Sequence, residues 1–208
     1  MTLEGGVKSP PAPAAHPAGT RIEVRDLFFA TPARLKFLKA DRTETGHALD
    51  VLKRLAMAYP EVAFSATADA RTLLRLDAAP GDLFASRLGR LKGVLGAEFA
   101  AAALKIEAER GAMTLAGYAG LPTLNRAHAR AQYLFVNGRP VRDKLLFGCV
   151  RAAYQDLLAR DRHPVVALFL ELAPEAVDVN VHPAKAEVRF REAEAVRGLI
   201  IGALKHAL

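Results

Sequence analysis

Cysteine, tryptophan and long apolar runs are what this sequence lacks most clearly. Cys149 is the only cysteine among 208 residues, and tryptophan is absent. A single cysteine excludes an intrachain disulfide and a zinc site built from several cysteines, and it is typical of a reducing cytoplasm. No stretch approaches the ~18 consecutive apolar residues of a membrane span, and no basic segment followed by an apolar run marks a secretion signal. We therefore expect a cytoplasmic protein that is neither exported nor embedded in a membrane.

Motifs of common enzyme chemistry are also missing. The sequence contains no GxxxxGK[ST] phosphate loop, no Rossmann glycine pattern after a strand, no HExxH and no GxSxG. Cys149 falls on the apolar side of its predicted helix, where a thiol is most simply a small core residue. No nucleophile stands out.

The composition is that of a folded, basic protein. Hydrophobic residues make up 51% of the chain and charged residues 25%, which is ordinary for a soluble globular protein. The formal net charge is +7 and the pI is about 9.8. Such a charge fits a polyanionic partner, because clustered Lys and Arg release counterions from phosphates, but it fits an ordinary basic surface equally well.

The chain opens with a segment that predicts no regular structure. Residues 1–18 hold four prolines among alanines, so we expect a flexible lead-in. From Gly19 the apolar residues Ile22 and Val24 alternate with charged ones and lead into residues 27–29, which predicts a half-buried strand. Thr31 followed by proline then predicts a helix start and a short basic turn over residues 33–39.

The rest of the chain divides into two predicted regions. A helix over residues 43–58 ends before Pro60, and two short strands over 61–68 and 71–77 follow. A linker over residues 78–82 marks the expected domain boundary. Beyond it we expect the following elements: helices over residues 83–91, 141–158 and 196–207, and strands near 102–108, 112–119, 131–136 and 165–172. The last of these strands is almost entirely apolar, which predicts a central strand covered on both faces.

Positive charge is concentrated between residues 125 and 151. This stretch holds six basic residues and one acidic residue, Asp143; the basic residues are Arg126, Arg130, Arg139, Arg142, Lys144 and Arg151. Within it Asn137-Gly138 predicts a tight turn that leaves Arg139 exposed at a strand end. A solvated helix face is one interpretation. Phosphate contacts explain the missing acidic counterweight better.

Residues 177–190 read VDVNVHPAKAEVRF. Alternation predicts a strand that places Asp178, Asn180 and His182 on one face. These three do not predict a metal site, because Asn is a poor ligand for transition metals and no carboxylate pair accompanies it. Pro183 breaks the ladder and places Lys185 on a loop, where a lysine taken alone is usually just solvated.

Three segments in this order resemble the MutL family of mismatch repair proteins, a branch of the GHKL ATPase superfamily. They are GTRIEVRDLFFATPAR, QYLFVNGRPVRD and VDVNVHPAKAEVRF. The first is similar to the family's last ATPase motif, although Ala30 stands where the family often has Asn. The third is similar to its highly specific DVNVHPxKxEVRF signature. The resemblance covers nearly the whole chain from Ala15 onward.

The resemblance implies an α/β (α+β) chain made of two domain types. Residues 1–18 would end the ATP lid, and residues 19–80 would be the C-terminal part of a GHKL ATPase α/β sandwich. Residues 81–208 would form a DNA-binding transducer domain with a ribosomal protein S5 domain 2-like fold, a mixed sheet with helices on one side. The family's catalytic helix, DxGxG loop and GFRGEAL lid are not in the sequence. We therefore expect a fragment without ATPase activity of its own and without a bound cofactor.

The resemblance also implies roles for particular residues. Thr20 matches a residue near the adenine pocket, and Lys185 matches a lysine that reaches the γ-phosphate of ATP from the second domain. Arg139 matches a DNA-binding arginine, and we expect the neighbouring basic residues of its stretch to bind DNA with it: Arg126, Arg130, Arg142 and Lys144. Structural or interdomain roles are expected for Arg34, Asp178, Asn180 and His182.

In the intact protein the resemblance implies ATP with Mg²⁺, DNA bound without sequence preference, homodimerisation and a MutS-type mismatch recognition partner. Localisation would be cytoplasmic, with nucleoid association during repair. One alternative comes from a different class of protein. A free-standing nucleic-acid-binding module of S5 domain 2-like fold would bind DNA with no nucleotide dependence.

Overall fold

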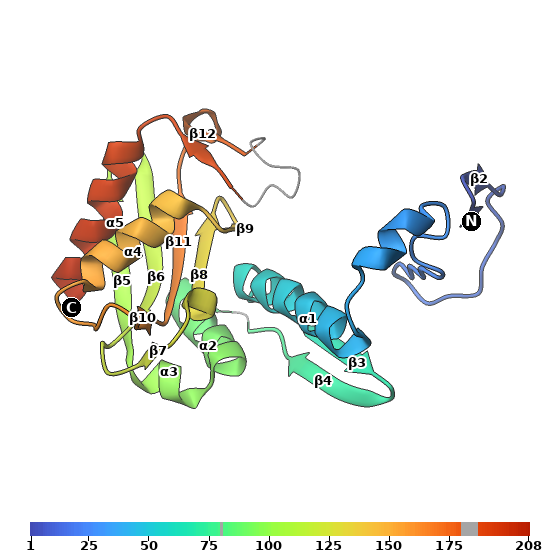
Figure 1. Cartoon of the computed structure of the whole chain (residues 1–208), viewed down its shortest axis with the longest axis horizontal. Helices are drawn as coiled ribbons and strands as arrows, with labels where there is room; N and C mark the ends of the chain where they lie inside the picture. Colours follow the sequence, from blue (N-terminus) through green and yellow to red (C-terminus); the bar gives the residue numbers. More distant parts are fainter. Residues whose placement is uncertain (80, 180–186) are drawn as a thin grey trace. The chain divides into compact units, whose positions relative to one another are not determined.

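The computed structural model describes residues 1–79, 81–179 and 187–208 (Figure 1). The chain forms two compact units, Met1–His47 and Ala48–Leu208. The domain boundary expected over residues 78–82 stays a prediction. None of the described helices is long and apolar enough to cross a membrane.

The first unit is small and exposed. A short hairpin pairs β1 (Leu3–Glu4) with β2 (Val7–Lys8), ahead of the prolines, and a 3-10 helix, η1 (Pro32–Phe37), follows Thr31. The strand expected from residue 22 to residue 29 is not formed: Ile22 is 83% exposed, and the segment joins no sheet among the described residues. The prediction was wrong here because alternation selects a strand only where a neighbouring strand pairs with its backbone.

Helix α1 (Asp41–Ala58) continues into the second unit and packs on a hairpin there. The hairpin pairs β3 (Phe64–Ala68) with β4 (Arg71–Leu76), and both strands lie within their predicted ranges. Ala56, Leu74 and Leu76 form a small buried cluster between them. As expected, the helix ends just before Pro60.

A five-stranded mixed sheet is the centre of the second unit. Its order is β5-β6-β11-β8-β9; β11 runs parallel to β8, and the other neighbours are antiparallel. The strands are β5 (Ala103–Arg110), β6 (Met113–Gly120), β8 (Gln132–Val136), β9 (Arg139–Val141) and β11 (Val166–Glu171). Gly117 permits a close approach of β6 to β11, because a Cβ there would collide with the carbonyl oxygen of Ala167.

Strand β11 confirms the prediction of a central strand covered on both faces. Val166, Leu168 and Leu170 point into one cluster of buried side chains, while Ala167 and Phe169 point into another. Period-two alternation sends neighbouring side chains to opposite faces, so a strand buried on both sides has no polar position until its end. The ring of Phe169 stacks on Phe135 of β8 at 4.5 Å between centroids.

Helices cover both faces of this sheet, which corrects the expectation of helices on one side (Figure 1). On one face lie α4 (Lys144–Tyr154) and α5 (Ala193–Ala207). On the other lie α2 (Leu83–Leu95) and α3 (Ala97–Ala101), which contribute Leu91 and Phe99. Both faces need a helical layer because both are apolar.

Helix α4 is shorter than the predicted 141–158 at both ends. Asp143 caps its N-terminus by accepting hydrogen bonds from the backbone N–H groups of Leu145 and Leu146, so the helix begins at Lys144. Val141 belongs to β9 instead. The buried side of α4 includes Leu146, Cys149, Val150 and Ala153, as the apolar stripe predicted.

Short elements complete the unit. They are β7 (Asn125–Arg126), η2 (Ala129–Ala131), β10 (His163–Pro164), η3 (Pro174–Ala176), β12 (Val177–Asp178) and β13 (Arg189–Phe190). Strand β10 pairs with β7, and β12 pairs with β13.

Candidate DNA-binding surface

The β8–β9 turn is built as the sequence predicts and is tied to the end of β11. Asn137 and Gly138 both have positive φ, as a tight hairpin turn requires. The side-chain amide of Asn137 donates to the carbonyl of Leu172 and accepts from its N–H, both at 3.0 Å. The backbone N–H of Asn137 donates to the carbonyl of Leu170. Three hydrogen bonds therefore fix the turn that precedes Arg139, the first residue of β9.

Two cations flank this turn without an ionic partner among the described residues. Arg139 is exposed at the first position of β9, and Lys144 is exposed at the first position of α4. An acidic group, Glu171, also lies near the turn. Burial raises the pKa of Glu171, and the neighbouring Arg87 and the backbone of Gly138 oppose that rise. Among the described residues, the turn end therefore carries two cations without an ionic partner, with the exposed Glu171 near them.

Arg142 belongs to the same end but is paired. Its guanidinium donates to the carboxylate of Asp50 in α1 at 2.9 Å, and the same oxygen accepts a hydrogen bond from Arg54 at 2.9 Å. One aspartate thus neutralises part of the charge of two arginines. Because the side chain of Arg142 is 62% exposed, this pair is screened by water and its net stabilisation is small.

Arg126 and Arg130 lie near the opposite end of β8, away from Arg139. Arg126 of β7 donates to the carboxylate of Glu98 in α3 at 3.0 Å. Arg130, in η2, is exposed and has no ionic partner among the described residues. The basic stretch is continuous in sequence, but the fold divides it between the two ends of the sheet.

The fold also adds two arginines that were not among the residues predicted from the sequence. Pairing of β10 with β7 places His163 opposite Arg126 and brings Arg160 and Arg162 to this end. Arg162 donates to the side-chain oxygen of Asn125 at 2.5 Å. In the sequence the only signal was the short run RDRH at 160–163, whose Asp161 lowers its net charge.

Thr20 and Lys185 were expected at a nucleotide, and structural or interdomain roles were expected for Arg34, Asp178, Asn180 and His182. Thr20 and Arg34 are exposed in the first unit, Arg34 in η1 and Thr20 outside any helix or strand. Asp178 lies in β12 opposite Arg189. Asn180, His182 and Lys185 lie outside the described residues.

Comparison with known proteins decides the family. The family described as "DNA mismatch repair protein, C-terminal domain" matches residues 91–208, more than half of the chain. The chain belongs to this family of DNA mismatch repair proteins. Proteins named MutL from Paramagnetospirillum magneticum and Rhodospirillum rubrum are each 64% identical over 208 residues, which is 100% of this chain. The chain spans about a third of their length, 34% and 33% respectively.

Solved structures agree on the fold of the mismatch repair family. The Aquifex aeolicus MutL ATPase domain, solved in complex with ADP, is 27% identical with a TM-score of 0.56, and the match covers 85% of this chain and 55% of that one. The N-terminal domain of a DNA repair protein superposes with a TM-score of 0.69 over 86% of this chain and 58% of that one. At 22% identity the second match shows the fold alone. The fold class expected from the sequence, a GHKL ATPase part with an S5 domain 2-like part, is confirmed.

Proposed function

We propose that this chain binds the DNA backbone through the end of the sheet formed by the β8–β9 turn and the start of α4. The observation that carries the proposal is a pair of exposed cations without an ionic partner among the described residues, Arg139 beside a turn held by three hydrogen bonds and Lys144 at the start of α4. Guanidinium and ammonium groups at fixed positions suit phosphate oxygens, and no base-reading motif accompanies them. Binding should therefore be independent of sequence and strongly dependent on salt.

The predicted DNA-binding residues do not contribute equally to this proposal. Arg139, Lys144 and Arg130 have no ionic partner in the part of the chain that the structure describes, whereas Arg142 and Arg126 must first leave Asp50 and Glu98. Exposed ion pairs cost only about 0 to 1 kcal/mol to break, so both arginines remain available to a polyanion. We assign the main contacts to Arg139 and Lys144 at the turn end and auxiliary contacts to Arg142, Arg126 and Arg130.

A pair of charge reversals tests this assignment. Arg139→Glu should weaken binding of a labelled duplex well beyond Arg71→Glu, although both reverse one exposed charge. Arg71 lies in β4, far along the chain from the basic stretch, and has no ionic partner among the described residues. Fluorescence anisotropy at two salt concentrations measures both affinity and salt dependence. Equal losses in the two variants would mean that only net charge matters and would remove the turn from the proposal.

In a protein of the relatives' full length, we propose that the DNA-binding part is coupled to an ATP site. Support comes from family membership and from the A. aeolicus MutL ATPase domain, which binds ADP. Lys185 would contact the γ-phosphate, Thr20 would lie near the adenine, and Mg²⁺ would accompany the nucleotide. Homodimerisation, a MutS-type partner and the domain boundary near residue 80 belong to this same proposal.

Lys185→Ala separates the nucleotide role from the DNA role. In the full-length protein it should cut ATP turnover substantially and leave nucleotide-free DNA binding nearly unchanged, because an ammonium is a compact partner for a terminal phosphate. In the 208-residue chain the same change should do almost nothing. Steady-state turnover and anisotropy on both proteins provide the measurement. Normal turnover combined with lost DNA binding would transfer Lys185 to the DNA surface.

A further inference from the structure

A hollow of about 430 Å³ lies at the C-terminal end of α4, at the end of the sheet opposite the β8–β9 turn. Its walls come from the start of β8, the last turn of α4, the loop over residues 155–162, and β10. The residues that matter to its chemistry are Gln132, Arg151, Asp156, Arg160, Arg162 and His163. Of these six, the sequence pointed only to Arg151, as part of the basic stretch.

The first indication of a ligand is an amide that lines the hollow. Gln132 is 3% exposed as a residue, and its side chain forms no hydrogen bond within the part of the chain that the structure describes. Its amide atoms are not among the buried unpartnered polar atoms of the described residues, so they remain accessible from the hollow. An oxygen-rich ligand in the hollow would accept from the amide N–H groups.

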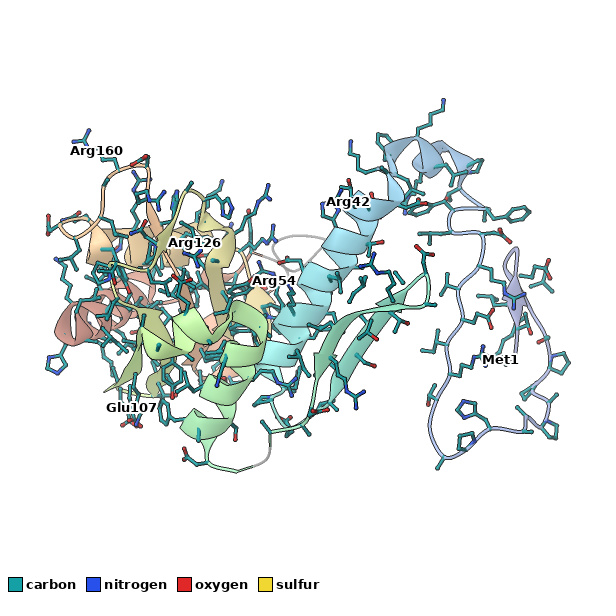
Figure 2. The ribbon with its side chains drawn as sticks, turned by 90° about the horizontal axis from the view of Figure 1, so that it is seen from below. Met1, Arg42, Arg54, Glu107, Arg126 and Arg160 are labelled. Atoms are coloured by element: carbon teal, nitrogen blue, oxygen red, sulfur yellow. The ribbon has the colours of Figure 1, made fainter. Side chains whose placement is uncertain are left out.

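The second indication is the charge of the walls. Three arginines and a histidine face one acidic residue, Asp156. Arg162 is held at the rim by its hydrogen bond to Asn125, while Arg160 projects from the loop into solvent (Figure 2). Arg151 is exposed on α4, and the structure gives it no ionic partner among the described residues. Guanidinium groups around a recess are suited to the planar, two-point recognition of a phosphate.

The third indication is a path that joins the hollow to the turn end. Lys144, Arg151 and Gln155 follow one another at helical spacing along α4 and its C-cap, and all three are exposed. Helix α4 contains no acidic residue, and Gly148 leaves open space at its middle. From Lys144 to Gln155 the rise along the helix is about 16 Å, the length that about five successive phosphates occupy on one strand of duplex DNA.

We propose that this hollow is a second phosphate-binding site, which takes a phosphate of a nucleic-acid backbone that runs along α4 from the turn end. The proposal deepens the proposed function and, in its nucleic-acid part, rests on it. A free phosphate compound offers the same chemistry. The test therefore uses both a nucleic acid and pyrophosphate as probes of the 208-residue chain.

The nucleic-acid arm compares single charge reversals. Arg151→Glu and Arg160→Glu should each weaken binding of a labelled 20-base-pair duplex several-fold relative to Arg71→Glu. Each should also reduce the slope of log affinity against log salt by about 0.9, the change expected when the protein neutralises one phosphate fewer. Arg139→Glu should do the same independently, since its turn lies at the other end of the sheet.

The pyrophosphate arm uses isothermal titration calorimetry. Wild type and Arg139→Glu should bind pyrophosphate, and Arg151→Glu should lose that binding. Gln132→Leu removes the amide without changing charge and should weaken pyrophosphate binding, with circular dichroism confirming that the variant folds. If Gln132→Leu fails to fold, Arg160→Glu, an exposed surface change, carries this arm instead.

The outcomes separate this inference from the proposed function. In one outcome Arg139→Glu weakens duplex binding, Arg151→Glu has no more effect than Arg71→Glu, and no pyrophosphate binds. That outcome overturns the phosphate site in the hollow and leaves the proposed function standing. Pyrophosphate binding without any duplex binding overturns the proposed function and assigns the hollow to a free phosphate compound. A several-fold weaker duplex affinity together with lost pyrophosphate binding in Arg151→Glu supports the inference as stated.

Discussion

The two ends of the five-stranded sheet carry similar charge but hold it in different ways. At the turn end, hydrogen bonds of the Asn137 side chain hold the backbone of the turn. Arg139 in β9 and Lys144 at the start of α4 lie at this end without ionic partners among the described residues. At the hollow end, the cations surround a recess, and Arg162 and Arg126 are held by hydrogen bonds to Asn125 and Glu98. The turn end presents cations beside a fixed turn, and the hollow end has cations around a recess. An exposed cation beside a fixed turn can contact a phosphate of a nucleic-acid backbone that passes over it, whereas a recess can enclose a phosphate group.

Removing the clamp at the turn end should produce the largest effect. Asn137→Ala loses two side-chain hydrogen bonds and places a Cβ-bearing residue without a local hydrogen bond at φ +47°. We expect the free energy of unfolding to fall by about 2 to 3 kcal/mol. Duplex affinity should fall with it, because Arg139 loses its fixed base. Urea denaturation and anisotropy measure the two effects.

Asn137→Gly is the matched control, since glycine accepts positive φ without strain and still lacks the amide. It should recover the part of the loss that comes from backbone conformation. If both variants keep full stability, the clamp is not what distinguishes the turn end.

Alkaline pH should lower the stability of both ends of the sheet together, because Cys149 lies in the middle of α4 between them. Burial raises the pKa of the Cys149 thiol from 9.0 to about 11. The stability that comes from keeping this thiol neutral is complete below pH 9.0 and is lost as the pH rises toward 11. By pH 10 the loss should be about 1 kcal/mol.

Cys149→Ala isolates this contribution. The buried tyrosines titrate in both proteins, so the difference between wild type and variant over pH 8 to 10 reports the thiol alone. Thermal denaturation should give a flatter pH dependence for the variant. Parallel curves of melting temperature against pH for the two proteins would show that ionisation of the Cys149 thiol does not contribute to the loss of stability.

Removing the side-chain amide of Asn125 should lower the stability of the hollow end. Asn125→Ala loses the hydrogen bond to the carbonyl of Pro122 and the one from Arg162. Both groups are partly exposed and water can replace the amide, so we expect a loss of about 1 kcal/mol. Chemical denaturation measures it. Pyrophosphate affinity should fall as well, and an unchanged affinity would mean that Arg162 needs no support from Asn125.

Releasing a paired arginine should produce the smallest effect, in the opposite direction. Asp50→Asn removes the charge that holds Arg142, while its amide oxygen still accepts from Arg54. Duplex affinity should rise slightly, and the salt slope should steepen by up to about 0.9 as one more cation becomes available. Anisotropy over a salt series tests this. An unchanged slope would show that Arg142 already contacts DNA in spite of Asp50.

Much of the local structure could be predicted from the sequence. The run over residues 165–172 predicted a strand buried on both faces, and Asn137-Gly138 predicted the tight turn that exposes Arg139. The strand expected from residue 22 was wrong although its alternation is as clear as elsewhere, because a strand also needs a neighbour. The motif residues near Lys185 lie outside the described residues, so their roles remain predictions.

The sequence by itself determined the family, the central strand and the turn at Asn137, because each depends on residues that are adjacent in the chain or on a pattern that they form together. The tertiary structure decided which cations are free. Asp50 meets Arg142 across 92 positions, Glu98 meets Arg126 across 28, and Asn125 meets Arg162 across 37. A charge run records only how many cations a segment has. Whether a cation can reach a phosphate depends on what the fold places beside it.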